Sequence, residues 1–329
     1  MESTVLITGA SGLLGANLVR YMHQLGYKIR ILVRPGAHLA VLADIPMEII
    51  HGYIDRKESV EEAVQGCDYV VHAASLTTQW GTSYEEYKKI NIHATQLIAQ
   101  ACLAYKVKRL IYISTANTLA PGSKTSPGTE LNAFGLHHIN SGYINSKYVA
   151  LQYIQEQVQQ NGLPAIIVSP TFMIGRYDVK PSSGQMVLHG IKKGIMAYPS
   201  GGKNFVHVED VCAGIVKAIE KGTIGEHYLL AGHNLSYKEF FRLTDFHAGS
   251  RRRKVQIPGS LLRGLGRLGS LVQSLSGKSI KLNYASAYML SLDNYYSGKK
   301  AERELGIEYK SIELAVADAV AWFRETKYC

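Results

Sequence analysis

Apolar residues in the first half of the chain form short, nearly continuous runs that alternate with segments of helical spacing. The apolar runs occupy residues 4–8, 28–33, 47–50, 68–72, 109–114 and 165–169. Between them, apolar side chains recur at the spacing of one helix face over residues 13–25, 84–105 and 143–159. Short apolar strands that alternate with helices predict βαβ units and a parallel sheet that is covered on both faces. The pattern therefore predicts an α/β fold, a Rossmann-type doubly wound parallel sheet.

The regular alternation ends after residue 170, where short helices, glycine-rich turns and a few strands follow. We expect residues 1–170 to form a nucleotide-binding domain, and residues 204–229 to return to it. Residues 171–203 and 230–329 then form a smaller, mixed C-terminal lobe that binds substrate. A chain of 329 residues is long enough to build both parts.

One segment of the expected lobe has a distinct amphipathic pattern. Leu261, Leu265 and Leu268 lie at helical spacing, and Arg263 and Arg267 stand between them. We interpret this segment as a lid helix whose leucines pack on the lobe. A helix that lies on a membrane surface is the alternative interpretation.

A glycine-rich turn follows the first predicted strand and opens the first predicted helix. Its glycines form a GxxGxxG pattern. Glycines let the backbone approach a pyrophosphate closely, and a helix N-terminus supplies free N–H groups and a partial positive charge. The residues expected to contact a dinucleotide here are Gly9, Ser11, Gly12, Leu13, Leu14 and Gly15.

The second predicted strand ends at an arginine, Arg34, with no acidic residue close by. In dinucleotide-binding folds an acidic side chain near this place binds the ribose 2′-hydroxyl of NAD, whereas arginine accommodates the 2′-phosphate of NADP. Arg34 would make a charge-assisted hydrogen bond to that phosphate. The sequence therefore predicts NADP(H) as the preferred cofactor, with NAD(H) as the alternative.

A YxxxK pattern, from Tyr143 to Lys147, falls in the third predicted helix, and its spacing places both side chains on one face. A nearby ammonium lowers the pKa of a phenol, so Tyr143 is expected to move a proton near neutral pH. Thr115 follows the strand at 109–114, whose carboxyl end faces the ligand crevice. We expect its hydroxyl to bind the substrate oxygen, and Ser114 is the alternative by one position.

Together these motifs resemble the extended short-chain dehydrogenase/reductases, also described as the NAD-dependent epimerase/dehydratase family. The similarity covers nearly the whole chain, and the dihydroflavonol-4-reductase-like and 3β-hydroxysteroid dehydrogenase-like branch is the most similar. The family's catalytic residues correspond to Thr115, Tyr143, Lys147 and Asn91. The resemblance implies further cofactor contacts from Ala73, Ala74, Ser75, Ser114, Tyr143, Lys147, Pro170, Thr171 and Met173.

Two positions depart from the family's pattern. The family usually has Gly-Asp-Leu after the third strand, where the aspartate meets the adenine amine. Here Gly52 is followed by Tyr53 and Ile54, and Asp55 is displaced. Tyr53 and Ile54 stay the candidate contacts there, with Tyr53 stacking on the adenine. Ala120 stands near the asparagine that holds substrate hydroxyls in the plant reductases, so flavonoid specificity is not expected.

Composition narrows the classes of function. Apolar residues make up 46% of the chain and charged residues 19%, as in an ordinary soluble globular protein. The formal net charge is +10, and the run from Arg251 to Lys254 contributes to it. No nucleic-acid-binding motif accompanies that run, so a nucleic-acid partner is not expected. A signal peptide and a membrane span are not expected either, which favours a cytoplasmic protein.

The four cysteines are scattered along the chain, with neither a CxxC pair nor the spacing of a metal site. They are Cys67, Cys102, Cys212 and Cys329. We expect reduced thiols in a reducing compartment and no metal site.

The sequence therefore predicts an NADP(H)-dependent oxidoreductase that reduces a ketone or aldehyde, or oxidises the corresponding secondary alcohol. The expected substrate is a mostly hydrophobic small molecule, because the candidate wall residues are largely apolar or aromatic. The candidate substrate contacts are Thr115, Trp80, Phe172 and Met186. A nucleotide-sugar epimerase or dehydratase with tightly bound NAD and a non-catalytic NADP-sensing protein are the alternatives. Helices at 84–105 and 143–159 are candidates to pair in a homodimer.

Overall fold

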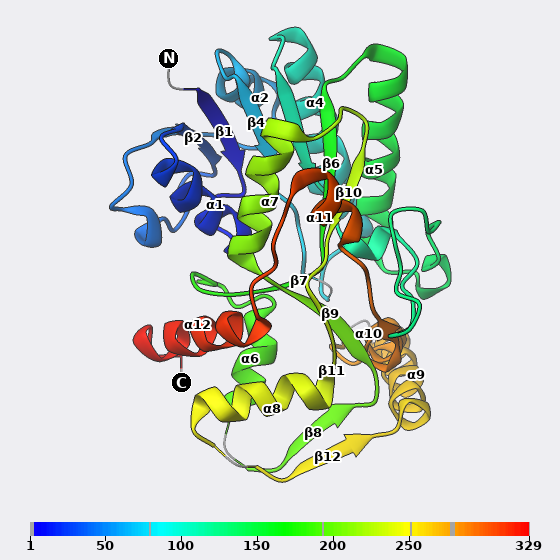
Figure 1. Ribbon diagram of the computed structural model, residues 1–329. Helices are drawn as coiled ribbons and strands as arrows, with labels where there is room; N and C mark the ends of the chain where they lie inside the picture. The colour runs from blue at the N-terminus through cyan, green and yellow to red at the C-terminus, as the bar shows by residue number, and fades with distance from the viewer. Residues whose placement is uncertain (1–2, 79, 193, 251, 277–279, 329) are drawn as a thin grey trace.

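The computed structural model describes residues 3–78, 80–192, 194–250, 252–276 and 280–328 (Figure 1). Arg251 and Cys329, which the sequence analysis considered, lie outside these ranges. A large parallel sheet occupies the upper part of the view in Figure 1, and α8 with strands β8 and β12 lies in the lower part.

The large sheet has seven strands in the order β10-β6-β5-β4-β1-β2-β3, and every neighbouring pair is parallel. The strand order reverses between β1 and β4, and ligands bind at such a switch point, outside the carboxyl ends of the strands. The strands are β1 (Thr4–Thr8), β2 (Lys28–Val33), β3 (Glu48–His51), β4 (Tyr69–His72), β5 (Arg109–Ile113), β6 (Ala165–Pro170) and β10 (His227–Leu230).

Helices cover both faces of this sheet, which explains why its central strands are apolar throughout. One buried cluster joins the sheet to α1 (Leu13–Gln24), α7 (Val208–Lys221) and α11 (Lys299–Leu305). A second cluster joins the opposite face to α2 (Lys57–Val64), α4 (Ala94–Ala104) and α5 (Gly142–Asn161). The doubly wound parallel sheet predicted from the sequence is confirmed.

One predicted helix differs from the structure in its continuity. Residues 84–105 were expected to form a single helix, but they form α3 (Tyr84–Tyr87), a π-helical segment at Lys88–His93, and α4. A π-helical turn widens the helix locally and is often found at functional sites. It carries the candidate residue Asn91, which is buried.

The smaller lobe combines two small sheets with three helices around a core of its own. In its larger sheet, β9 pairs with three strands, in parallel with two of them and antiparallel with β11. The strands are β7 (Phe172–Ile174), β8 (Met196–Pro199), β9 (Gly202–His207), β11 (His233–Ser236), β12 (Lys254–Ile257) and β13 (Asp293–Asn294). The core helices are α6 (Gly184–Ile191), α8 (Tyr237–Ala248) and α12 (Ile312–Glu325).

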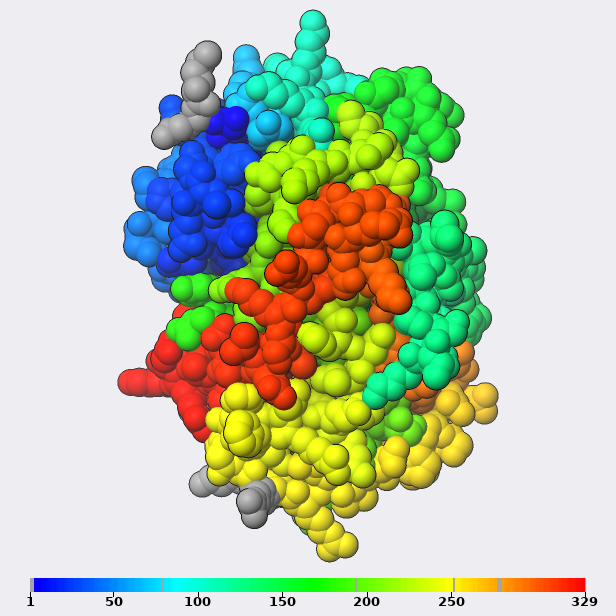
Figure 2. Space-filling view, viewed as in Figure 1, coloured from blue at the N-terminus to red at the C-terminus, as the bar shows by residue number. Residues whose placement is uncertain are grey.

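The chain returns from the lobe to the large sheet through α7 and β10. Helix α7 packs against α1 and β10 pairs with β6, so both lie with the seven-stranded sheet. Strand β9, which precedes α7, belongs to the smaller sheet. In Figure 2 the blue N-terminal segment and the yellow segment around α8 lie at opposite ends of the molecule.

The expectation that the leucine-rich segment packs on the lobe as a lid is wrong for most of its leucines. The segment forms α9 (Gly259–Ser276), which lies against α10 (Tyr284–Ser291) at the edge of the lobe (Figure 1). Only Leu262 and Gly266 of α9 are buried, whereas Leu261, Leu265 and Leu268 are exposed by 55%, 43% and 60%. Among the described helices, none combines the length and apolar character that a membrane crossing requires.

Candidate active site

The turn between β1 and α1 brings the backbone of two loops unusually close together. Gly9 has a φ of +77°, and a Cβ added there would lie 2.8 Å from the backbone nitrogen of Ala74. A Cβ on Gly15 would lie 2.2 Å from the carbonyl oxygen of Gly9. The turn therefore requires glycine at both positions, for its left-handed backbone at Gly9 and for helix packing at Gly15.

The N-terminus of α1 has the features of a phosphate-binding site. Gly12 caps this helix without a side-chain hydrogen bond, and the first turn has no acidic residue. Gly12 is exposed and Ser11 partly exposed, while Leu13 and Leu14 are buried beneath them. Uncapped N–H groups and the positive end of the helix dipole suit a pyrophosphate, so the residues present fit a dinucleotide.

The end of β2 presents Arg34 to solvent. This arginine has no ion-pair partner among the residues that the structure describes. Tyr53 is half exposed after β3, which leaves its ring free to stack on a flat ligand. Ile54 instead packs against the buried cluster beneath α2 and α4. The displaced Asp55 pairs with Lys89 at 2.9 Å, so its carboxylate already has a partner.

A buried hydrogen-bond chain joins the ends of β1 and β4 to the π-helical segment. The Thr8 hydroxyl lies 2.9 Å from Nδ1 of His72, and Nε2 of His72 lies 3.0 Å from the Thr95 hydroxyl. Thr8 accepts a hydrogen bond from the backbone of Ala74, and Thr95 donates one to the carbonyl of Asn91. One neutral His72 tautomer satisfies all of these bonds, and burial lowers its pKa to about 3.

The side chain of Asn91 connects the β4 loop to helix α5. Its Oδ1 accepts hydrogen bonds from the Leu76 backbone at 2.7 Å and from the Ser75 hydroxyl at 3.0 Å. Its Nδ2 donates to the Ser146 hydroxyl at 2.9 Å, and that hydroxyl donates to the carbonyl of Tyr143. Asn91 thus holds the first turn of α5, which carries the candidate proton donor.

Tyr143 and Thr115 meet at the carboxyl end of β5. A hydrogen bond from the Thr115 hydroxyl acts on the Tyr143 phenol and partly opposes the effect of burial, which raises the pKa of Tyr143 to about 12. The expectation of a lowered pKa is therefore wrong for the protein alone. Burial is the largest influence on the pKa of Tyr143.

Lys147 lies one helical turn after Tyr143 and is buried, with 2% of its surface exposed. Its ammonium donates a hydrogen bond to the carbonyl of Ile113 at 2.7 Å and lies 4.5 Å from the centre of the Tyr112 ring. Burial lowers the pKa of Lys147 to about 7. The lysine therefore fixes α5 against β5 directly behind Thr115.

The structure distinguishes the two candidate hydroxyls at the end of β5. Thr115 faces Tyr143, whereas the Ser114 hydroxyl is buried and has no hydrogen-bond partner within the described chain. The backbone N–H of Thr171 and its hydroxyl are occupied, by the Leu230 carbonyl and by Asn204 respectively. Pro170 is buried at the end of β6 and Met173 is partly exposed.

The candidate wall residues for substrate do not all gather at Tyr143. Phe172 packs edge-on against Phe205, with ring centres 5.6 Å apart, and Met186 packs against the lobe core. Trp80 is 45% exposed, and its nearest cation is Lys281 at 5.5 Å from the ring. Among these four described candidates, Thr115 is the one whose side chain hydrogen-bonds Tyr143.

A hollow of about 510 Å³ borders the start of α5. It is lined mainly by polar side chains from α3, α5, α9 and α10, including Asn140, Asn145 and Asn283. Tyr143 on α5 and Ala285 and Tyr288 on α10 all pack against one buried cluster, which contains Phe134 and Ile144.

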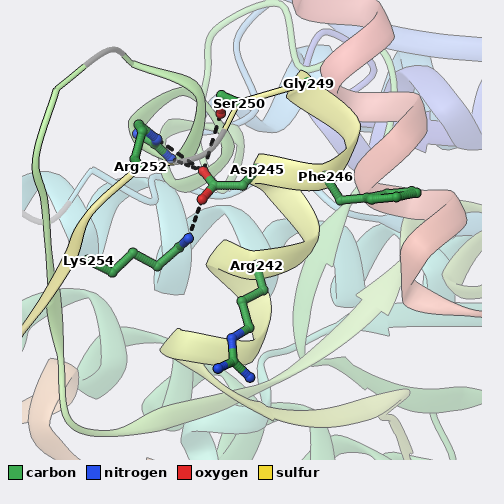
Figure 3. Close-up of a pocket in the computed structure, with 7 residues that line it drawn as sticks. All are labelled: Arg242, Asp245, Phe246, Gly249, Ser250, Arg252 and Lys254. Carbon is green, nitrogen blue, oxygen red and sulfur yellow. Dashed lines mark hydrogen bonds and ion pairs between the residues drawn. The ribbon is translucent and has the colours of Figure 1, made fainter.

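A second hollow, of about 580 Å³, lies at the end of α8, far from β1 and β4 (Figure 3). Asp245 lines this hollow, where its carboxylate forms ion pairs with Arg252 at 2.6 Å and with Lys254. Arg252 also donates to the carbonyl of Lys192 at 2.5 Å. These charges already have partners, so this hollow is a structural joint between α8, β12 and the loop after α6.

Lys203 is a candidate cation for substrate binding that was not predicted from the sequence. Its ammonium lies 5.2 Å from the Phe172 ring, and it has no ion-pair partner within the described residues. Burial lowers the pKa of Lys203 to about 8. The signal in the sequence was a lysine within a short strand that also contains Phe205 and Val206.

Comparisons with known proteins agree with this geometry. The model of the NAD dependent epimerase/dehydratase family matches residues 5–231. A putative dihydroflavonol 4-reductase of Synechocystis is 28% identical over 100% of this chain and 96% of its own length. Sterol demethylase protein B of Methylococcus capsulatus is 27% identical over 98% of this chain and 98% of its own length. The solved structure of a nucleoside-diphosphate-sugar epimerase from Pseudomonas aeruginosa is 25% identical, with a TM-score of 0.83 over 100% of this chain and 99% of that one. With this fold and this glycine turn, the chain belongs to the NAD dependent epimerase/dehydratase family, the extended short-chain dehydrogenase/reductases.

Proposed function

We propose that the protein is an NADP(H)-dependent oxidoreductase that reduces a ketone or aldehyde, or oxidises the corresponding alcohol, on a mostly hydrophobic molecule. The observation that carries this proposal is the Thr115 hydroxyl beside the Tyr143 phenol, at the carboxyl edge of the sheet that also carries the glycine turn. A non-catalytic NADP-sensing protein would not need this pair.

The raised pKa of Tyr143 suits the direction of reduction. With a pKa of about 12, the phenol keeps its proton at neutral pH. NADPH, when bound, supplies the hydride. The Thr115 hydroxyl would hold the carbonyl oxygen of the substrate, and that oxygen would take its proton from Oη of Tyr143. Asn91 and Lys147 would act by positioning, through the first turn of α5 and through β5.

The preference for NADP(H) over NAD(H) rests on Arg34. Its guanidinium is exposed at the end of β2 and unpaired within the described chain, so it is free to bind a 2′-phosphate. The turn of Gly9 to Gly15 would hold the pyrophosphate. Ala73 to Ser75 and the unpaired Ser114 hydroxyl would line the rest of the cofactor site.

A hydrophobic substrate is supported by the names of two relatives, a putative dihydroflavonol 4-reductase and a sterol demethylase protein. The apolar candidates Phe172 and Met186 do not carry this proposal, because they pack against Phe205 and the lobe core. A nucleotide sugar would need cations that bind its diphosphate. Two cations that could serve already have acidic partners: Arg176 binds Glu325 and Arg252 binds Asp245.

Nucleotide-sugar epimerisation with bound NAD is the second candidate. A relative of known structure is named as such an epimerase, and the unpaired Lys203 is the cation that favours it. Thermal stabilisation of the NADP complex separates the two functions, using hydrophobic ketones and alcohols in one set and nucleotide sugars in the other. We expect stabilisation by the first set, with NADPH consumed by a ketone. Stabilisation by nucleotide sugars alone, with an epimerised product, would overturn the proposal.

A further inference from the structure

Helix α9 exposes an apolar stripe that no other part of the described chain covers. The stripe consists of Leu261, Leu265, Leu268, Leu271, Val272 and Leu275, whose exposed fractions run from 43% to 80%. Five of them follow each other at intervals of four, three, four and three residues, which places them on one face of the helix. The helix is held from another side, where Leu262 and Gly266 are buried against α10.

Such a stripe is unusual for a surface helix. An amphipathic helix normally turns its apolar face toward the core, and scattered single leucines are what a protein surface usually carries. A continuous stripe in contact with water opposes folding of this face unless something else covers it. The cover must come from outside the described chain.

The charge of the sequence segment that contains α9 favours one kind of partner for this stripe. Between Asp245 and Asp293 the sequence contains no acidic residue. It contains eight basic residues there: Arg251, Arg252, Arg253, Lys254, Arg263, Arg267, Lys278 and Lys281. This segment carries a formal charge of +8, while the whole chain carries +10. Asp245 offsets part of this charge by binding Arg252 and Lys254.

Two arginines flank the stripe rather than interrupt it. Arg263 donates to the Ser291 hydroxyl at 3.0 Å, and Arg267 lies 5.6 Å from the Tyr284 ring, so both are on the side of α10. An apolar stripe with cations along its flank and no acidic residue in the helix is the pattern of a helix that lies in a membrane interface.

We propose that α9 docks this protein on the surface of an anionic phospholipid bilayer. The leucine stripe enters the region between headgroups and acyl chains, and cations that flank it, such as Arg263 and Arg267, bind lipid phosphates. A second copy of the chain is the less favourable occupant, because two-fold pairing through α9 would bring two segments of charge +8 together. This inference is independent of which compound the active site reduces.

Vesicle flotation with the full-length protein tests the proposal. We expect binding to vesicles that contain phosphatidylglycerol, at least tenfold weaker binding to vesicles of phosphatidylcholine alone, and loss of binding at high salt. The triple variant Leu268→Gln, Val272→Gln, Leu275→Gln should bind at least about tenfold more weakly, since three inserted side chains become polar. Its thermal midpoint should stay at that of the unmodified protein.

A matched control replaces three apolar residues of similar exposure on other elements. The control is Leu25→Gln, Ile224→Gln, Leu314→Gln, at positions exposed by 52%, 50% and 55%. It should bind vesicles like the unmodified protein. The proposal is overturned if the unmodified protein fails to float with anionic vesicles, or if both triple variants bind equally. A dimer that the α9 variant alone dissociates, without vesicle binding, would assign the stripe to a second copy.

Discussion

Two regions differ in how far their side chains find partners within the chain: the carboxyl ends of β1 and β4, called the crevice here, and helix α9. In the crevice, Thr8, His72, Thr95 and Asn91 form one chain of hydrogen bonds, and the glycine turn touches the backbone of Ala74. On α9, six apolar side chains face solvent. The first region is built for a ligand that meets the backbone, and the second is incomplete without something outside the chain.

The two regions also differ in what a substitution should do. In the crevice, function and stability depend on the same atoms, because buried hydrogen bonds hold the candidate catalytic residues in place. On α9, polar substitutions leave the fold intact, since the side chains are already in water.

Tyr143→Phe should lower turnover by on the order of 10²-fold or more, because it removes the transferable proton and keeps the ring. Folding and cofactor binding should persist. The matched control is Tyr148→Phe on the same helix, where the tyrosine ring stacks on Phe134 at 4.3 Å. Steady-state kinetics on both variants decide the matter, and equal rates in the two would place the proton donor elsewhere.

Gly9→Ala should destabilise the fold by about 2–4 kcal/mol, from a strained backbone together with overlap against Ala74. Gly26→Ala separates the two causes. Gly26 has a φ of +84° with nothing within 4 Å of an added Cβ, so alanine there adds backbone strain without steric overlap. Urea unfolding of the two variants measures the difference. Equal losses would mean that the close approach of the two loops contributes nothing.

Arg34→Ala should weaken NADP binding by about tenfold or more and leave NAD binding nearly unchanged, because one charge-assisted hydrogen bond is lost. Calorimetric titration of both cofactors provides the measurement. Arg56→Ala, at an exposed arginine just before α2, is the control. The NADP preference would be contradicted if the unmodified protein bound NAD as tightly as NADP.

Lys147 should make stability depend on pH. Its pKa in the folded protein is about 7, below the ordinary value of 10.5, so the unfolded chain binds more protons between these two values. The free energy of unfolding should therefore rise with pH across this window, relative to Lys147→Met, by at most about 1.4 kcal/mol per pH unit. Urea unfolding between pH 7 and about pH 9 checks the sign. Parallel curves for the two proteins would show that the lysine keeps its proton in the fold.

The large sheet was predictable because burial on both faces leaves a nearly continuous apolar run, as in β6, where all six residues are buried. The π-helical segment was not, since the residues around Asn91 keep a helical spacing on both sides of it. The position of Tyr143 followed from a motif, but the direction of its pKa shift did not. That direction depends on burial, which outweighs the lysine four residues away.

Helix α9 shows a different limit. Its periodicity was visible in the sequence, and it identifies which leucines share a face. Periodicity does not say what covers that face: α9 packs on α10 of the lobe through Leu262 and Gly266, whereas Leu261, Leu265 and Leu268 are exposed. Lys203 was not among the residues predicted from the sequence, and its place over the Phe172 ring marks it as a candidate cation for a substrate.

Net transfer of a hydride from NADPH to the substrate, with a proton from Tyr143, can be followed with an isotope label. The protein is incubated with a hydrophobic ketone and NADPH that carries deuterium on the B face of the nicotinamide, the face that the family is expected to present. Mass spectrometry of the alcohol follows. We expect one deuterium in the alcohol and one NADPH consumed for each alcohol formed, with both rates lower by on the order of 10²-fold or more in Tyr143→Phe. An alcohol without deuterium, or a nucleotide sugar epimerised with no net use of NADPH, would contradict this mechanism.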